Sequence, residues 1–292
     1  MKRTRLPELE DLSWFPHALR RWQLDHLHHF LHHSAVYAAA VDRLDDALRR
    51  SNATHVLDLC SGGGGAVPWV IDAINAKRST AQGKDVDARP VQATLSDLYP
   101  NLPAFERLAG HHEGIDFERA PIDATRVDAT QTGFRTIFTG FHHLPPAAAE
   151  AVLTDAARAG RGLAVFEFTR RAWHQAALGT FVAPLQMLLD TPKLRPRSVW
   201  RYLWTYVLPV LPLTYAFDST VSHLRSYTPG ELEAMAERAN TAARAAGHPG
   251  LVWRVETERH AKLPLTITSL IGLPDAAAQA QPGSVEARRA AA

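Results

Sequence analysis

Short apolar runs alternate with helical or polar stretches through the middle of the chain. Five runs rich in β-type residues, at 56–59, 91–95, 115–120, 134–140 and 162–168, are separated by helix-like patterns or polar loops. The fourth run, FRTIFTG, is apolar almost throughout, as is typical of a central parallel strand. Because strand–helix–strand crossovers are right-handed, the alternation predicts an α/β fold with a parallel sheet that binds ligands at the carboxyl ends of its strands.

Helical patterns flank this alternating region. Before the first strand, apolar residues recur at helical spacing from Trp14 to Leu31, and residues 36–48 predict a second helix. After the fifth strand, residues 173–189 are helical. A further helix is predicted from Thr228 to about Ala246. The last two strands are predicted from apolar runs at 252–257 and 265–273.

One interruption of the pattern, residues 199–217 (VWRYLWTYVLPVLPLTYAF), is almost entirely apolar or aromatic. Arg201, Pro209 and Pro212 argue against a helix that crosses lipid. Three explanations stay open: a hydrophobic lid over a substrate site, a dimer or core contact, and an interfacial contact with a membrane.

Composition narrows the class of protein. Of 292 residues, 46% are hydrophobic and 21% charged, which predicts a folded chain. The net charge is only +2, from 32 Lys and Arg residues and 30 Asp and Glu residues, which argues against a nucleic-acid-binding protein. A single cysteine, Cys60, excludes an internal disulfide and a cysteine-built metal site. We expect a cytoplasmic protein without an export signal, with a disordered tail over residues 275–292.

The stretch at 54–65, THVLDLCSGGGG, joins the first strand to a helix through four consecutive glycines. Glycines let a ligand approach the backbone, and the following helix begins with unpaired N–H groups. A dinucleotide fingerprint would need a third glycine where the chain has Val67 or Pro68, and a P-loop lysine is missing before Lys77. Both phosphate-binding interpretations therefore fail.

The spacing Asp58-x-x-x-Gly62-x-Gly64 resembles the first motif of class I S-adenosylmethionine-dependent methyltransferases, with Cys60 where the first glycine is usual. The strings DLCSGGGG, LSDLYPN, GFHHLPP, AVFEFTRR and DSTVSHLRSYTP extend the likeness over roughly 10–273, to a bacterial subgroup of largely unassigned substrate. The resemblance implies S-adenosylmethionine as cofactor and a Rossmann-like, seven-stranded, mostly parallel sheet whose last strand is antiparallel.

The same resemblance implies a domain organisation. Residues 1–50 are expected to form an N-terminal helical cap, of which 14–37 cover the site. Residues 51–274 are expected to form the methyltransferase domain, with a helical lid inserted at 170–225 and a loop after Asp218.

Asp97, at the end of the second strand, is the predicted partner of the cofactor's ribose, because a carboxylate can accept two hydrogen bonds from a diol. Capping of a helix at 98–108 is the alternative role, and Asp85 and Asp87 compete from the polar loop at 78–90. The resemblance places Asp123 against the adenine amino group. The full predicted cofactor set is Asp58, Cys60, Ser61, Gly62, Gly63, Gly64, Asp97, Leu98, Asp123, Ala124, Gly140 and Phe141.

Methyl transfer to oxygen or nitrogen needs a proton acceptor, and His142 at the end of the fourth strand is the first candidate. His143, Glu167 and Asp218 are further candidates, with Tyr227 as an orienting hydroxyl. His142 could instead be a packing or capping histidine, and Glu167 could equally make a structural hydrogen bond. An Asp218–Arg225 ion pair could fix the lid or bind a polar end of the substrate. The aromatic residues Trp14, Phe15, Trp200 and Trp204 point to a small or medium apolar-aromatic substrate. The predicted substrate residues are Trp14, Tyr37, Trp200, Trp204, Asp218, Arg225 and Tyr227.

The histidine-rich run at 26–33 contains the i, i+4 pairs His28/His32 and His29/His33, a spacing that can hold a metal. No further ligand of matching spacing accompanies them, so we expect no metal and a solvated face. Other function classes stay open: S-adenosylmethionine binding without methyl transfer, for a cyclisation or as a non-catalytic partner, and a membrane-surface interaction protein. A small-molecule substrate is expected, nucleic acid is not, and a homodimer is left open.

Overall fold

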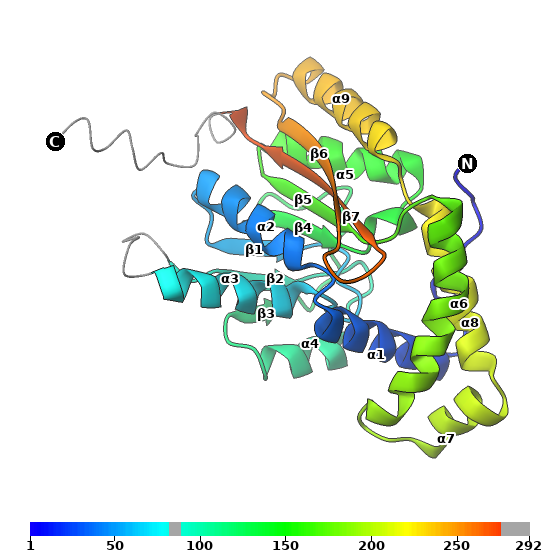
Figure 1. Ribbon diagram of the computed structural model, residues 1–292. Coiled ribbons are helices and arrows are strands. Elements are labelled where there is room, and N and C mark those ends of the chain that lie inside the picture. Colours follow the sequence, from blue (N-terminus) through cyan, green and yellow to red (C-terminus); the bar gives the residue numbers. More distant parts are fainter. Residues whose placement is uncertain (82–88, 276–292) are drawn as a thin grey trace.

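The computed structural model describes residues 1–81 and 89–275, and its centre is one seven-stranded sheet (Figure 1). The strand order is β3-β2-β1-β4-β5-β7-β6. Strands β1 to β5 pair in parallel, whereas β7 is antiparallel to both of its neighbours. This topology confirms the predicted fold class. The strands are β1 His55–Asp58, β2 Gln92–Leu95, β3 Ile115–Phe117, β4 Phe134–Phe138, β5 Leu163–Glu167, β6 Val252–Arg259 and β7 Thr266–Leu273.

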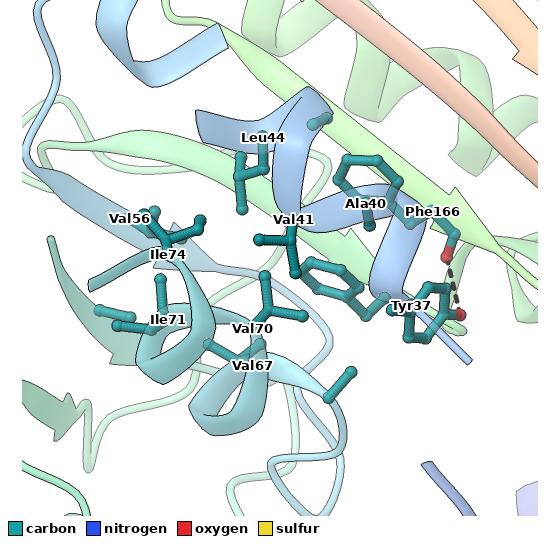
Figure 2. Packing of buried hydrophobic residues seen from close by; sticks show 14 of the residues in the cluster. Tyr37, Ala40, Val41, Leu44, Val56, Val67, Val70, Ile71, Ile74 and Phe166 are labelled. Carbon is teal, nitrogen blue, oxygen red and sulfur yellow. Dashed lines mark hydrogen bonds between the residues drawn. The ribbon is translucent and has the colours of Figure 1, made fainter. Parts of the chain in front are cut away.

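Both faces of the sheet are covered, because successive strand residues point to opposite sides. Val56 and Phe166 belong to a core with helices α2 (Ala38–Arg50), α3 (Val67–Ala81) and α4 (Leu102–Ala109). Their chain neighbours Leu57 and Val165 belong to a second core, with α5 (Pro146–Ala159) and α9 (Pro229–Ala245). Figure 2 shows the first core, where α2 and α3 bring branched aliphatic side chains together over β1.

The remaining helices form a separate layer beyond the end of β5. They are α1 (His17–Ser34), α6 (Trp173–Asp190), α7 (Val199–Tyr202) and α8 (Val210–Arg225), with a π-helical turn at Leu203–Val207. Phe15 and Trp22 pack against Met187 of α6 and Leu211 of α8. Figure 1 shows α6 and α8 side by side, extending away from the sheet. Over the described residues, no helix combines the length and apolar character that a membrane crossing requires.

Three local expectations are wrong. The loop predicted from residue 78 begins later, because α3 continues to Ala81 and the buried Arg78 guanidinium donates to Asp45 (2.7 Å) and to the Arg89 carbonyl. The helix predicted from residue 98 begins at Leu102, where Asn101 caps it. The loop expected after Asp218 is part of α8. Asp85, Asp87 and residues 276–292 lie outside the described residues.

Candidate functional site

The glycine turn after β1 is shaped by four residues with left-handed backbone: Cys60 (φ +57°), Gly62 (+55°), Gly64 (+87°) and Gly65 (+35°). Cys60 thus adopts the conformation expected of the glycine that it replaces, and burial raises the pKa of its thiol. A Cβ on Gly64 would lie 2.1 Å from Leu108 Cδ1 of α4. A Cβ on Gly62 or Gly63 would meet no atom within 4 Å. The turn is therefore packed underneath and open on its other side.

Asp58 lies beneath this turn and is almost completely buried. Its carboxylate accepts hydrogen bonds from the hydroxyls of Ser61 and Thr136, both at 2.6 Å. Burial raises the pKa of Asp58 to about 7, and the two hydroxyls limit this rise. Asp58 and Ser61 therefore organise the turn from inside.

Asp97 joins the end of β2 to the turn. One carboxylate oxygen accepts the Gly62 N–H (2.8 Å), and the other accepts the Tyr99 N–H (2.8 Å). Asp97 does not cap α4, whose N-cap is Asn101. Beside it, the side chain of Leu98 is 45% exposed. The structure thus brings the predicted ribose partner to the open turn.

The other predicted cofactor residues surround the same edge. Asp123 is exposed and accepts hydrogen bonds from the hydroxyl (2.7 Å) and the N–H (2.9 Å) of Thr125, which lower the pKa of its carboxyl. Ala124 is buried next to it. Gly140 follows β4, where a Cβ would lie 3.2 Å from the Cβ of Cys60, and Phe141 is buried. Gly140 and Phe141 thus border the site on the β4 side. Asp123 lies near the end of β2, because the Ile122 N–H beside it donates to the Asp97 carbonyl (2.9 Å).

His142 and Glu167 meet at the ends of β4 and β5. His142 Nδ1 lies 2.7 Å from Glu167 Oε2, and Glu167 Oε1 accepts the N–H groups of Phe141 (2.8 Å) and His142 (3.2 Å). Burial alone would raise the pKa of Glu167, but the adjacent His142 outweighs it and lowers the pKa. An ionised Glu167 requires Nδ1 to carry the proton. The orientation of the ring is therefore fixed through Nδ1.

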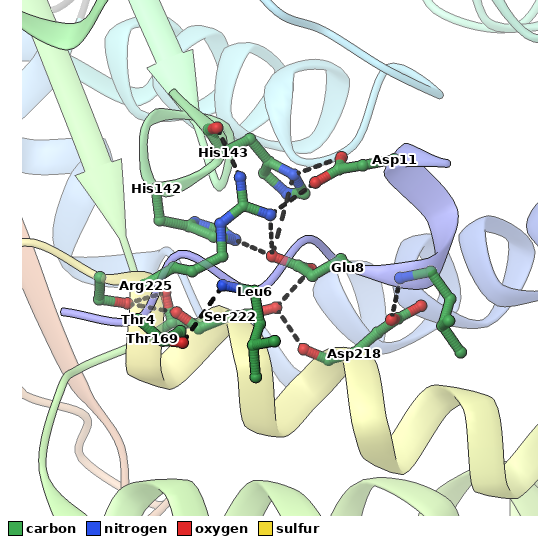
Figure 3. A network of polar contacts seen from close by, with 12 residues as sticks. Thr4, Leu6, Glu8, Asp11, His142, His143, Thr169, Asp218, Ser222 and Arg225 are labelled. Atoms are coloured by element: carbon green, nitrogen blue, oxygen red, sulfur yellow. Dashed lines mark hydrogen bonds and ion pairs between the residues drawn. The ribbon is translucent and has the colours of Figure 1, made fainter. Parts of the chain in front are cut away.

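The N-terminal segment covers this histidine (Figure 3). Glu8 Oε1 lies 3.6 Å from His142 Nε2 and 3.3 Å from the Arg225 guanidinium, and Ser222 donates to Glu8 Oε2 (2.6 Å). The half-buried His143 pairs with Asp11 at 2.9 Å. Burial lowers the pKa of His143, but Glu8 and Asp11 outweigh it and raise the pKa to about 10. His143 is thus held as a cation in this network.

The expected ion pair between Asp218 and Arg225 is not formed. Arg225 instead pairs with Asp11 (2.5 Å) and Glu8, and donates to the His143 carbonyl (2.6 Å). Asp218 accepts the Leu9 N–H (2.5 Å) and the Gln23 amide (3.2 Å), and burial raises its pKa to about 6. Both side chains lie on α8 and hold the N-terminal segment, which supplies the partners that the sequence did not indicate.

The predicted aromatic residues do not gather in one place. Tyr37 is buried and donates to the Phe166 carbonyl (3.1 Å) at the end of β5 (Figure 2). Tyr227 donates to the Leu144 carbonyl (2.7 Å). Trp204 packs, partly buried, in the α1–α6–α8 core. Trp14 and Trp200 are 69% and 65% exposed, so the structure brings neither to the site.

Potential metal ligands gather away from the His28/His32 and His29/His33 pairs. Within the described residues, one group of three possible ligands lies close together: Glu8, His142 and His143. The Arg225 guanidinium already neutralises the Glu8 oxygen of this group. His26, from the same run, is buried edge-to-face against Tyr215, and burial lowers its pKa to about 4. The run is therefore partly core, not simply a solvated face.

Several residues of the network were missed by sequence reasoning, chiefly Arg3, Glu8, Asp11 and Ser222. Arg3 donates to the carbonyls of His142 (2.8 Å) and Leu144 (2.9 Å). Residues 1–11 carry no hydrophobic periodicity, so no local signal marks them as part of the site.

No family model matches the chain, and no curated protein matches it. Among solved structures, it is similar to the methyltransferase domain of bacterial CtHen1-CN (15% identity, 80% of this chain and 98% of that one, TM-score 0.43). It is also similar to the plantazolicin methyltransferase BpumL in complex with SAH (10% identity, 91% of this chain and 94% of that one, TM-score 0.49).

A third similar structure is an O-methyltransferase family protein from Burkholderia thailandensis (14% identity, 81% of this chain, TM-score 0.40). The present chain covers 55% of that protein's length.

Proposed function

We propose that the protein binds S-adenosylmethionine at the carboxyl ends of β1, β2 and β4 and transfers its methyl group to a small or medium molecule. The observation that carries this proposal is the glycine turn, which is open above Gly62 and Gly63 and held at 2.8 Å by Asp97. A strand order with an antiparallel β7, as the motif resemblance implied, supports it.

The residues at this edge fit the cofactor. An ionised carboxylate offers about four lone-pair sites, and the Asp97 oxygens each accept one backbone N–H. The remaining sites can accept the ribose hydroxyls. Asp123 is exposed and has a lowered pKa, so it remains an acceptor for an adenine amino group. Leu98 supplies apolar surface for the adenine ring.

When bound, S-adenosylmethionine supplies an electrophilic methyl group, so the protein has to orient the acceptor, exclude water and remove a proton. We assign proton removal to His142, because Glu167 holds Nδ1 at 2.7 Å and leaves Nε2 to accept the proton. Glu8 lies 3.6 Å from Nε2. An oxygen or nitrogen nucleophile would therefore reach Nε2 when the segment around Glu8 moves aside.

The aromatic side chains at the end of β5 support an apolar-aromatic acceptor. Phe168 lies 5.8 Å from Phe30 of α1 and 6.1 Å from Tyr37, measured between ring centroids. Tyr37 is itself buried, so the partly buried Phe30 and Phe168 are the two rings that can face a further ring.

Calorimetric titration with S-adenosylmethionine and S-adenosylhomocysteine tests the cofactor assignment. We expect Asp97→Asn to abolish binding and Asp123→Asn to weaken it. Asp128→Asn is the matched control, because Asp128 accepts the same two hydrogen bonds from Thr130 that Asp123 accepts from Thr125. A folded wild-type protein that binds neither compound would refute the proposal.

Release of S-adenosylhomocysteine with a panel of phenols and aromatic amines tests methyl transfer. We expect release that depends on the acceptor and falls roughly 100- to 10,000-fold in His142→Gln, the usual range for loss of a general base. Cofactor binding without release for any acceptor would favour a cyclisation or a non-catalytic partner role instead.

A further inference from the structure

Exposed apolar side chains are concentrated on one part of the molecule. Twelve of the eighteen exposed large apolar side chains among the described residues lie within residues 173–217. Val199 is 83% exposed, Val207 68% and Phe181 74%. These residues belong to α6, α7, the π-helical turn and α8, which extend away from the sheet in Figure 1. Such a concentration on a soluble domain marks a contact surface.

The apolar residues follow the helical repeat. On α6 the exposed Phe181, Leu185 and Leu189 recur every four residues, and on α8 Leu213 and Phe217 do the same. Each set therefore lines one side of its helix. The helices pack together through the hydroxyls of Thr180 and Thr220 (2.6 Å), and Tyr206 donates to the Leu188 carbonyl. We call residues 181–217 with these exposed side chains the α6–α8 face.

The exposed charged side chains just before Val199 and Trp200 are all basic. No Asp or Glu occurs from residue 191 to 217, whereas Lys193, Arg195 and Arg197 are exposed directly before Val199 and Trp200. The preceding Asp190 is buried and already pairs with Lys193 at 2.7 Å. Arg201 is buried and pairs with Asp25. The face thus combines an apolar and aromatic surface with a basic border.

We propose that the α6–α8 face docks on the surface of an anionic lipid bilayer. Trp200 and Val207 enter the boundary between headgroups and acyl chains, and Arg195 and Arg197 meet the negatively charged headgroups. A second copy of the chain fits this face less well, because a two-fold contact would bring the same arginines together. The proposal does not depend on methyl transfer.

Vesicle flotation of the full-length protein tests it. At low salt we expect wild type to float with phosphatidylcholine vesicles containing 30% phosphatidylserine, and less with pure phosphatidylcholine. Trp200→Ser/Val207→Ser should lower partitioning about tenfold or more, because apolar burial is lost. Arg195→Gln/Arg197→Gln should lower it about fivefold for each charge removed. Val252→Ser, an exposed apolar residue on β6, is the matched control and should float like wild type.

Several outcomes would overturn the proposal. Wild type that does not float would do so, as would a Trp200→Ser/Val207→Ser variant that floats normally. Equal flotation on neutral and anionic vesicles, unaffected by the arginine substitutions, would remove the anionic assignment. Sedimentation that finds a wild-type dimer, dissociated by Trp200→Ser/Val207→Ser, in a protein that binds no vesicles would assign the face to a second copy instead.

Discussion

Substitution by alanine should have different effects at two neighbouring glycines of the turn after β1. Gly63→Ala should weaken cofactor binding, whereas Gly64→Ala should lower the free energy of unfolding. In Gly63→Ala the backbone is outside the left-handed region and the new methyl meets no atom within 4 Å. In Gly64→Ala the backbone keeps φ near +87° and the methyl would lie 2.1 Å from Leu108 Cδ1. One substitution therefore probes the space above the turn, and the other probes the packing beneath it.

The expected magnitudes follow from these positions. A left-handed backbone costs an alanine roughly 1–2 kcal/mol, and overpacking against Leu108 adds about 1–3 kcal/mol. Gly64→Ala should therefore lower the free energy of unfolding by about 2–5 kcal/mol. Gly63→Ala should leave this free energy unchanged or raise it by about 0.4–1 kcal/mol, because alanine restricts the unfolded chain. The Gly63→Ala variant should nevertheless bind S-adenosylmethionine at least roughly tenfold more weakly than wild type, a loss of about 1.4 kcal/mol in binding free energy.

Urea unfolding measures the first quantity and calorimetric titration the second. Combining Gly64→Ala with Leu108→Ala closes a double-mutant cycle, and the pair should cost less than the sum because the contact at Cδ1 is removed. Unchanged cofactor binding by Gly63→Ala would refute the assignment of the open side to the cofactor. A Gly64→Ala protein as stable as wild type would refute the packing argument.

Three further predictions concern buried charge. Glu167→Gln should lower the free energy of unfolding by about 1.5–3 kcal/mol in urea titrations, because it replaces the charge-assisted hydrogen bonds that buried Glu167 accepts from His142 and Phe141. Arg225→Gln should lower the free energy of unfolding by about 3–5 kcal/mol, because Glu8 and Asp11 both lose their guanidinium partner, and Glu8→Gln in the same background should restore part of it. Burial lowers the pKa of His26 from 6.5 to about 4. Its stabilising contribution is therefore complete above pH 6.5 and is lost as the pH falls towards 4. His26→Leu should flatten the pH dependence of thermal unfolding in that window.

The placement of the residues that we propose for cofactor binding could be predicted, because its signals are local. Asp58, the glycines and Asp97 stand at strand ends, and the carboxyl ends of parallel strands lie at one edge. The sequence also placed His142 and Glu167 at strand ends. Their contact depends on the pairing of β4 with β5, in which Phe138 lies opposite Phe166. Sequence order alone does not specify that register.

The other side of the site could not be predicted. Glu8 and Arg225 are separated by 217 residues, and residues 1–11 have no periodicity from which a contact could be inferred. The aromatic side of the site could not be predicted for a related reason. Trp200 and Trp204 lie in the same apolar stretch of the sequence, but Trp200 is exposed and Trp204 packs in a core. The composition gives the number of apolar side chains, but it does not determine which of them are buried against other side chains.

The sequence by itself therefore determined the α/β sheet, the glycine turn and the acidic residues beside it, because periodicity, strand ends and backbone conformation are properties of short segments. Only the tertiary structure decided that the N-terminal segment covers His142, that Asp218 and Arg225 have separate partners, and that the α6–α8 face is exposed. These features depend on burial and on charge pairing between distant segments, which arise only when the whole chain has packed.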